Sequence, residues 1–325
     1  MIGEVVALSG GVGGAKLALG LARVLDDGQL TIIANTGDDF SHLGLSISPD
    51  VDTLVYTLAG LADPVQGWGR RDETWAFMSA LEQLGGATWF RLGDADVAMH
   101  VERTWRLAAG ETLSAVTDRL RRRLGIAARI LPMTDDPVRT RLETDAGWLD
   151  LQDYFVRRHC TPIIRRLEFL GADHARPLPQ VMASLGSQDL RAVVICPSNP
   201  FLSIEPILAI PAIRAALAGC HAPVVAVSPV IGGQAVKGPT AKIMHELGLE
   251  SSSADVARRY ADLLDVFVVD EVDAATTVPA GIEVISTPTL MTSLEDRERL
   301  ARVVLAAADR AAKRRIEPPY PAGIS

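Results

Sequence analysis

Cysteine is scarce in this sequence of 325 residues, which contains only Cys160, Cys196 and Cys220. The three are widely spaced and form no C-x-x-C pair, so neither a disulfide framework nor a cysteine-based zinc site is predicted. The sequence also lacks an apolar run of about 18 residues or more, and its first residues lead into a strand pattern rather than a cleavable signal peptide. We therefore expect a soluble protein of the reducing cytoplasm with no membrane partner.

An excess of positive charge is absent as well. The 40 Asp and Glu residues outnumber the 32 Lys and Arg residues, which gives a net charge of −8. Because nucleic acids and anionic lipid surfaces attract basic proteins, this balance argues against either partner. The one dense basic cluster, Arg119–Arg123, lies in a helical pattern and is typical of a solvated helix face.

Short apolar runs alternate with helical patterns along much of the chain. Runs such as EVVAL, LTIIA and VFVV are continuous, as expected for parallel strands covered by helices on both faces. This alternation predicts an α/β fold with a doubly wound, Rossmann-like parallel sheet. Residues 66–125 carry helical patterns, and residues 127–170 have the pattern of short strands around a turn at Asp145–Gly147. We therefore expect a Rossmann-like nucleotide-binding core formed by residues 1–65 and 186–325, with residues 66–185 as an inserted α+β subdomain covering the active site.

A glycine-rich loop, SGGVGGAK, follows the first predicted strand and opens the first predicted helix. It matches neither the G-x-G-x-x-G dinucleotide pattern, because Lys16 occupies the third glycine position, nor the Walker pattern. Its backbone N–H groups at a helix N-terminus favour an anion, and Lys16 adds a positive charge. We predict that Gly11, Gly13, Gly14 and Lys16 bind the phosphates of a nucleotide. The alternative is a tight turn that needs glycine only for its backbone conformation.

Four carboxylates, Asp38, Asp39, Asp50 and Asp52, follow the second predicted strand. Such a cluster repels itself unless a cation or a proton intervenes, and Mg²⁺ prefers oxygen ligands. We predict that Asp38 and Asp50 bind Mg²⁺, and that Asp39 points away, because adjacent residues rarely both reach one small ion. The alternatives are helix capping by Ser48 or Asp50, and a ribose contact of the Rossmann type.

Two further segments are rich in polar groups. The stretch PSNPFLSIEP follows a later strand, where Ser198 and Asn199 could contact a ligand and Ser203 could cap a helix. In the predicted insert, Arg91 follows Trp89 and Phe90, and it could contact an aromatic heterocycle or a phosphate. The isolated His100 is expected to be structural.

Nine short motifs, taken in the order in which they occur along the chain, resemble one family. From the N-terminal side these motifs are SGGVGGAK, NTGDDF, SPDVDT, GWGRRDETW, WFRLGDAD…H, LPMTDDPVRT, PSNPFLSIEPIL, SPVIGGQAVKGP and LMT. Together they are similar to the 2-phospho-L-lactate transferase family of coenzyme F420 biosynthesis, over residues 10–292. One departure is Ala95, at a position where relatives tend to carry arginine.

The resemblance implies an activity. The family transfers a phospho-carboxylate group (2-phospholactate, phosphoenolpyruvate or 3-phosphoglycerate) from a guanylyl-activated donor to the ribityl hydroxyl of the deazaflavin Fo. The reaction releases GMP and requires Mg²⁺, and a homodimer is typical of the family. By this similarity, Asp52 and Arg91 match the Fo-binding positions, and the glycine loop, Ser198 and Asn199 lie along the donor diphosphate.

The predicted roles divide the acids between metal and acceptor. Asp38, Asp50 and Asp52 are the expected catalytic residues, with Asp52 either orienting the ribityl chain of Fo or accepting its proton. Two other functions remain open from the residues alone. One is a nicotinamide-dependent oxidoreductase with Asp38 on the ribose, and the other is a non-enzymatic sugar-nucleotide-binding regulator of related fold.

Overall fold

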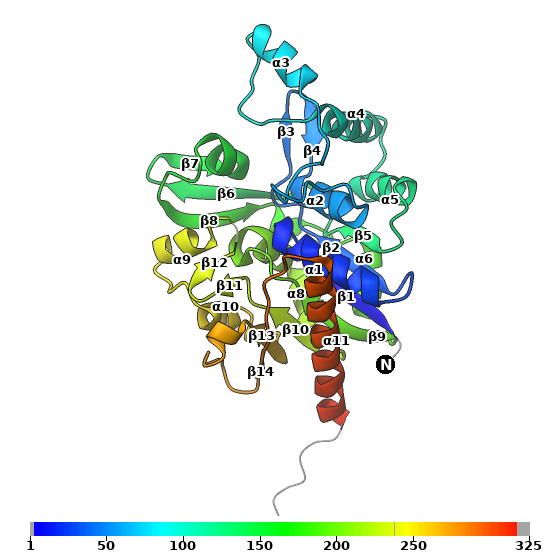
Figure 1. Ribbon diagram of the computed structural model, residues 1–325, viewed down its shortest axis with the longest axis vertical. Coiled ribbons are helices and arrows are strands. Elements are labelled where there is room, and N and C mark those ends of the chain that lie inside the picture. Colours follow the sequence, from blue (N-terminus) through cyan, green and yellow to red (C-terminus); the bar gives the residue numbers. More distant parts are fainter. Residues whose placement is uncertain (1–2, 237, 317–325) are drawn as a thin grey trace, which may run out of the picture.

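The computed structural model describes residues 3–236 and 238–316. Its centre is a parallel sheet of seven strands in the order β14-β13-β10-β9-β1-β2-β5 (Figure 1). The strands of this sheet are β1 (Glu4–Ser9), β2 (Leu30–Ala34), β5 (Arg129–Pro132), β9 (Leu190–Ile195), β10 (Val224–Val227), β13 (Val266–Val269) and β14 (Glu283–Ser286). The sheet confirms the predicted α/β class and its parallel, helix-covered core.

Helices cover both faces of the sheet, and the strand residues alternate between two apolar clusters. Val5 and Ala7 of β1 belong to one cluster, whereas Val6 and Leu8 belong to the other. The first cluster includes side chains of α1 (Gly11–Val24), α2 (Pro49–Leu58), α5 (Leu113–Arg123) and α11 (Leu294–Ile316). The second includes side chains of α6 (Pro179–Leu185), α7 (Glu205–Leu208), α8 (Pro211–Ala218), α9 (Thr240–Glu246) and α10 (Ser253–Arg259). Burial on both faces explains why the strands read as continuous apolar runs.

The strand order reverses at β1, which has β2 on one side and β9 on the other. From β1 the chain runs through β2 to β5 at one edge, and it later returns to β9 and runs to β14 at the other edge. Such a switch point leaves a crevice beyond the carboxyl ends of the two central strands, where ligands of open α/β sheets bind. The glycine loop after β1 and the PSNP loop after β9 meet there.

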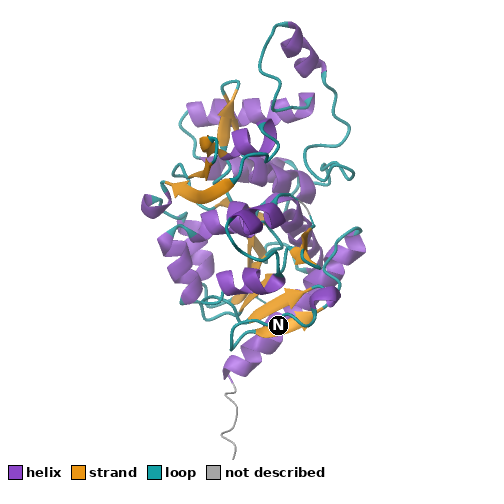
Figure 2. Cartoon of the chain, turned by 90° about the vertical axis from the view of Figure 1, so that its left-hand side faces the viewer, coloured by secondary structure: helices purple, strands orange, loops and turns teal. Residues whose placement is uncertain are grey.

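A second group of elements lies beyond this end of the sheet. A short hairpin, β3 (Phe40–His42) and β4 (Leu45–Ile47), precedes α2 and packs against α4 (Asp94–Ala108). Figure 1 shows α3 (Ala76–Gln83) at the extreme of the molecule, and Figure 2 shows the long loops that lead to the helix at this end.

A three-stranded antiparallel sheet, in the order β7-β6-β8, contains the predicted turn at Asp145–Gly147. Its strands are β6 (Arg139–Thr144), β7 (Gly147–Asp150) and β8 (Ile164–Leu170). The remaining short elements are β11 (Val230–Ile231), β12 (Gln234–Ala235), η1 (Asp153–Arg157), η2 (Ala172–His174), η3 (Pro200–Ile204) and η4 (Glu271–Asp273).

The structure corrects one part of the predicted insert. Within residues 66–185, strand β5 belongs to the central sheet, where Ile32 of β2 pairs with Ile130. The sequence pattern groups β5 with the strands that follow, because β5 is short and stands between a helix and a second set of strands. Its apolar residues Ile130 and Leu131 are buried on opposite faces, as in the other strands of the core. Residues 66–185 therefore contribute β5, and the helices α5 and α6, to the core.

Among the described residues, no single helix has the length and apolarity needed to cross a membrane. One bent pair, Pro200–Leu208 and Pro211–Ala218, passes the same criteria when taken together, with an angle of 86° between its halves.

Candidate functional site

The glycine loop is packed tightly against the loop that follows β9. The N–H of Gly10 donates to Ser198 Oγ at 3.2 Å. A side chain at Gly14 would clash with the hydroxyls of Ser198 and Ser9, and one at Gly13 would clash with the carbonyl of Pro197. Close approach of two backbones thus requires glycine here, in addition to the positive φ of +63° at Gly11.

The start of α1 is partly occupied by a carboxylate of the protein. The N–H of Gly11 donates to Asp50 Oδ1 at 2.6 Å. By helix geometry the next N–H groups, of Val12 and Gly13, have no partner within the helix. The loop can therefore contact an anion through these later amides, while Asp50 uses the first.

Asp38 and Asp50 lie together, joined by Asn35. The side-chain amide of Asn35 donates to Asp50 Oδ2 at 2.9 Å and to Asp38 Oδ1 at 3.4 Å. Asn35 is buried immediately after β2 and is a site residue that the sequence analysis missed. Its position at the end of a strand, next to two predicted ligands, is the signal that would have found it.

Burial makes these two acids difficult to ionise. Asp38 is 8% exposed and Asp50 is 7% exposed. Burial raises the pKa of Asp50 to about 6, although hydrogen bonds from Asn35 and Gly11 lower it. Burial and the neighbouring charges of Asp50 and Asp39 raise the pKa of Asp38 well above its usual range. Two such carboxylates favour either a proton or a cation between them.

The donor set fits Mg²⁺ as an open site. Hard oxygen ligands from two buried carboxylates suit this ion, which usually keeps waters and takes phosphate oxygens as further ligands. Two more polar atoms, Ser9 Oγ at the end of β1 and Thr36 Oγ1 two residues after β2, are buried without a hydrogen-bond partner among the described residues. Among all the residues that the structure describes, no group of three or more His, Cys, Asp or Glu side chains is arranged to hold a metal. The remaining ligands would therefore have to come from substrate and water.

The capping alternative for the acids does not match the geometry. Ser48 occupies the N-cap position of α2, but its side chain accepts no capping bond there and instead donates to Asp39 Oδ2 at 2.9 Å. Asp50 accepts from Gly11 at the start of α1 rather than capping its own helix. Asp39 is thereby held by Ser48, and burial raises its pKa to about 7.

Asp52 has a partner that the sequence analysis did not identify. Its Oδ2 accepts from Arg103 Nη1 at 3.1 Å, and its Oδ1 accepts from Arg103 Nη2. Arg103 lies on α4 and is fully buried. Burial alone would lower the pKa of Arg103, but pairing with Asp52 raises it. An arginine at i+3 from His100 on a helical pattern was visible in the sequence, but its partner 51 residues earlier was not.

His100 extends this pair into α4, in agreement with its expected structural role. Its Nδ1 lies 3.2 Å from Arg103 Nη1, and its Nε2 lies 3.2 Å from Asp96 Oδ1. Asp96 also accepts from the hydroxyl of Tyr56 on α2. An imidazole that accepts at Nδ1 and donates from Nε2 satisfies both neighbours at once.

Ser198 and Asn199 lie at the switch point, but both are engaged by the fold. Ser198 accepts from Gly10, as described above. Asn199 Oδ1 accepts from the N–H groups of Phe201 and Leu202 at 2.9 and 3.0 Å, and its amide donates to Thr240 Oγ1 at 3.0 Å. Asn199, rather than Ser203, therefore caps the following turn.

Lys16 lies one turn into α1. Its Nζ donates to the carbonyl of Met291 at 2.8 Å, in the segment just before α11. Helices α1 and α11 pack along each other, so this bond ties the glycine-loop helix to the C-terminal helix. The predicted contact of Lys16 with phosphate stays a prediction.

Arg91 is held by an aromatic ring, though not by its neighbours in sequence. Its guanidinium lies 4.2 Å from the centroid of the Trp75 ring and is otherwise exposed. Trp89 packs instead against His42, with ring centroids 4.9 Å apart, and Phe90 packs against Phe40 at the same separation. The structure thus separates Arg91 from an aromatic cluster formed by Phe40, His42, Trp89 and Phe90.

The acids of the GWGRRDETW and LGDAD motifs cap the helices of this region reciprocally. Glu73, just before α3, accepts from the N–H groups of Ala95 and Asp96 at the start of α4, at 2.8 and 2.9 Å. Asp94, at the start of α4, accepts from Phe77 N–H of α3 at 2.9 Å. These motif acids therefore fix α3 to α4.

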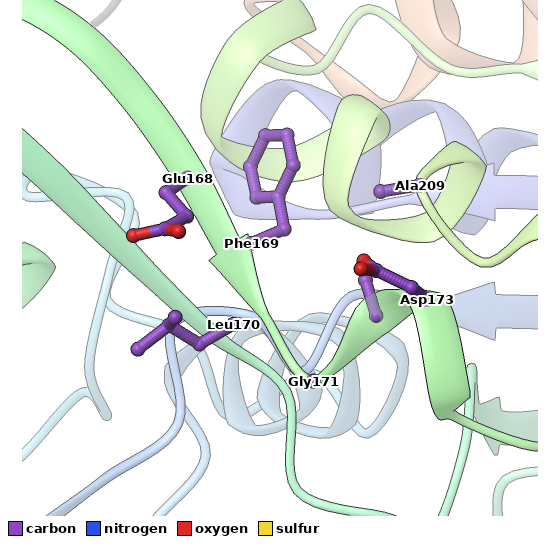
Figure 3. A pocket seen from close by; sticks show the side chains of 7 residues that line it. Glu168, Phe169, Leu170, Gly171, Asp173 and Ala209 are labelled. Carbon is purple, nitrogen blue, oxygen red and sulfur yellow. The ribbon is translucent and has the colours of Figure 1, made fainter.

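A pocket of about 190 Å³ lies elsewhere, at the end of β8. Figure 3 shows Phe169 and Asp173 beside Ala209, with Glu168 farther along the strand. None of the predicted site residues lines it. The candidate site is instead the crevice at the switch point.

Comparison with known proteins gives a consistent result. The family model described as 2-phospho-L-lactate transferase CofD matches residues 5–290. A phosphoenolpyruvate transferase of Streptomyces griseus is 42% identical over 315 residues, covering 94% of this chain and 98% of the relative. A 2-phospho-L-lactate transferase of Methanopyrus kandleri is 41% identical over 306 residues, covering 93% of this chain and 96% of the relative.

The solved structures support the fold. A UPF0052 family protein of Bacillus halodurans is 16% identical, with a TM-score of 0.61 over 94% of this chain and 99% of that one. At this identity the likeness extends to the architecture alone.

Proposed function

Because the chain belongs to the 2-phospho-L-lactate transferase CofD family of coenzyme F420 biosynthesis, we propose the following reaction for it. The ribityl hydroxyl oxygen of Fo attacks the phosphorus of a phospho-carboxylate group that is linked to GMP. A new P–O bond forms, the bond to the GMP phosphate breaks, and the hydroxyl proton is lost. The products are GMP and coenzyme F420-0 or its dehydro or glyceryl analogue.

One observation carries the proposal: the pairing of Asp38 and Asp50 across Asn35, directly beside the start of α1. Phosphoryl transfer to an alcohol depends mainly on alignment and on neutralising charge. Two buried acids with raised pKa values next to helix N–H groups supply a cation site and an anion site side by side.

Asp38 and Asp50 would hold Mg²⁺, which supplies charge neutralisation for the donor phosphates and the leaving GMP when it is bound. The chain's own groups would then orient the donor: the later amides of the glycine loop, with Lys16, Ser198 and Asn199 around them. Asp52 and Arg91 would bind Fo, with the exposed guanidinium of Arg91 available beside Trp75.

The transferred group belongs to the class of phospho-carboxylates. Relatives named phosphoenolpyruvate transferase and 2-phospho-L-lactate transferase are 42% and 41% identical, so identity does not select between them. These substrates differ by few atoms, and small differences in pocket shape decide among them. We propose a homodimer in the cytoplasm as the working form, and light scattering after gel filtration measures the assembly.

Family membership favours the transferase over the two other functions. In a nicotinamide-dependent oxidoreductase, the acid after the second strand binds a ribose, whereas Asp38 is paired with a second buried acid. A sugar-nucleotide-binding regulator has no need of an acceptor site.

Two experiments test the proposal. In a thermal-shift comparison with Mg²⁺ present, GDP should raise the melting temperature, whereas NAD and a UDP-sugar should not. Incubation of the protein with Fo and each guanylylated donor, followed by mass spectrometry, should give GMP and one coenzyme F420-0 analogue. Stabilisation by NAD without any product would refute the transferase function.

A further inference from the structure

Asp52 is held between three elements that come from separate parts of the chain. Arg103 of α4 contacts both of its oxygens, as described above. The same guanidinium donates to the carbonyl of Ser46 in β4 at 3.3 Å, and the neighbouring Thr104 Oγ1 accepts from Ser46 N–H at 2.8 Å. Arg103 thus joins α2, the β3–β4 hairpin and α4 at one buried point.

Arg103 is itself fixed by a chain of hydrogen bonds. His100 Nδ1 accepts from Arg103, and His100 Nε2 donates to Asp96, which also accepts from Tyr56. Asp96 N–H donates to Glu73, so the chain ends at the reciprocal caps of α3 and α4. These bonds restrict the long, flexible side chain of Arg103 to one orientation. A surface arginine would not be restricted in this way.

We propose that Arg103 is a positioning residue that fixes the carboxylate of Asp52 for the acceptor substrate. This inference rests on the proposed function, because it assumes that Asp52 contacts the acceptor. A carboxylate has about four lone-pair sites, and the fork of Arg103 uses two. The other two remain for hydroxyl groups of a polyol acceptor, and their directions are set by the guanidinium. Arg103 is fully buried, and in this proposal it acts on the acceptor through the carboxylate of Asp52.

The test is a double-mutant cycle on turnover with Fo. Arg103→Met and Asp52→Asn should each lower kcat/KM for Fo by about 10²-fold, because misplacement of a positioning group by about 1 Å has effects of that size. The double variant should lose little more than the worse single variant, since removing Arg103 has no further effect once Asp52 is changed. Affinity for GDP should stay within about twofold of wild type in all three.

A matched control separates positioning from general loss of structure. Arg121→Met removes another buried arginine, on α5, which bonds to Asp118 of the same helix and to the carbonyl of Ile126 beyond its end, outside the site. It should reduce thermal stability while leaving kcat/KM for Fo unchanged. If Arg103→Met does not fold, Arg103→Lys carries the test, because a single ammonium retains the charge but not the fork. It should lower kcat/KM for Fo about tenfold, again with GDP affinity unchanged.

The outcomes distinguish this inference from the proposed function. Multiplied losses of about 10⁴-fold in the double variant would show that Arg103 acts independently of Asp52 and would overturn the positioning role. Unchanged kcat/KM in Arg103→Lys would do the same. Absence of product from the wild-type protein with every donor would refute the proposed function itself.

Discussion

The buried acids of the site make the stability of the metal-free protein depend on pH. The pKa of Asp50 is about 6 in the folded chain, against 3.8 as its ordinary value. The folded state therefore binds more protons than the unfolded state between about pH 4 and 6, and stability falls as pH rises through this window. For Asp50 alone, this difference corresponds to roughly 3 kcal/mol at neutral pH. The raised pKa of Asp38 adds to the effect in the same direction.

Mg²⁺ held by Asp38 and Asp50, as proposed above, should reverse this loss, because a cation favours the ionised carboxylates. With a pKa of about 6, Asp50 is ionised to about one tenth at pH 5 and almost fully at pH 7.5. The affinity for Mg²⁺ should therefore rise at least about tenfold between these pH values, and binding near pH 6 should release protons.

Calorimetric titration with Mg²⁺ in two buffers of different ionisation enthalpy measures both the affinity for Mg²⁺ and the number of protons released on binding. Thermal melts with Mg²⁺ or EDTA should show a stabilisation by Mg²⁺ that grows from pH 5 to pH 7.5. Asp50→Asn is the control, since it removes one of the two titrating ligands and should show weaker binding with a smaller pH dependence, which Asp38 alone then supplies. Equal affinity of the wild-type protein at pH 5 and pH 7.5 would refute the assignment of these two acids to the metal.

Four further substitutions examine other parts of the crevice. Asp38→Asn should lower turnover by about 10²-fold without unfolding the protein, and excess Mg²⁺ should partly restore it; an unaffected rate contradicts the metal role. Lys16→Ala should weaken GDP binding more than Fo binding, as measured by calorimetry, and equal losses contradict a phosphate contact. Arg91→Ala should raise KM for Fo with GDP affinity nearly unchanged, and a collapse of GDP binding would move Arg91 to the donor side. Gly13→Ala should destabilise the protein by about 1–3 kcal/mol in urea melts, because its Cβ would meet a backbone carbonyl; Gly219→Ala, where the nearest atom is 3.4 Å away, is the control.

Local patterns in the sequence predict the core of this fold well. Continuous apolar runs identify the strands of a sheet buried on both faces, and the polar clusters after β1, β2 and β9 mark the carboxyl ends of adjacent strands. Strand β5 was assigned wrongly because membership of a sheet is decided by pairing with a distant strand. Four residues of ordinary strand pattern do not carry that information.

The site shows the same division between local and distant information. Asp38 and the glycine loop could be grouped because they follow adjacent strands of the same sheet, so topology alone brings them near one another. Asp50, at the start of α2, could be added only because the acids cluster in the sequence. The partner of Asp52 could not be found in this way, since Arg103 comes from a helix whose packing depends on the hairpin and on the caps of α3 and α4. The clustering of four acids in the sequence predicts repulsion that a cation or a proton must relieve. In the structure a buried arginine neutralises Asp52, whereas Asp38 and Asp50 share the side-chain amide of Asn35, and no basic side chain of the described residues is among the groups that lower their pKa values. This difference between Asp52, which has an arginine partner, and the two acids Asp38 and Asp50, which have none among the described residues, is the physical reason for proposing that the metal binds to Asp38 and Asp50.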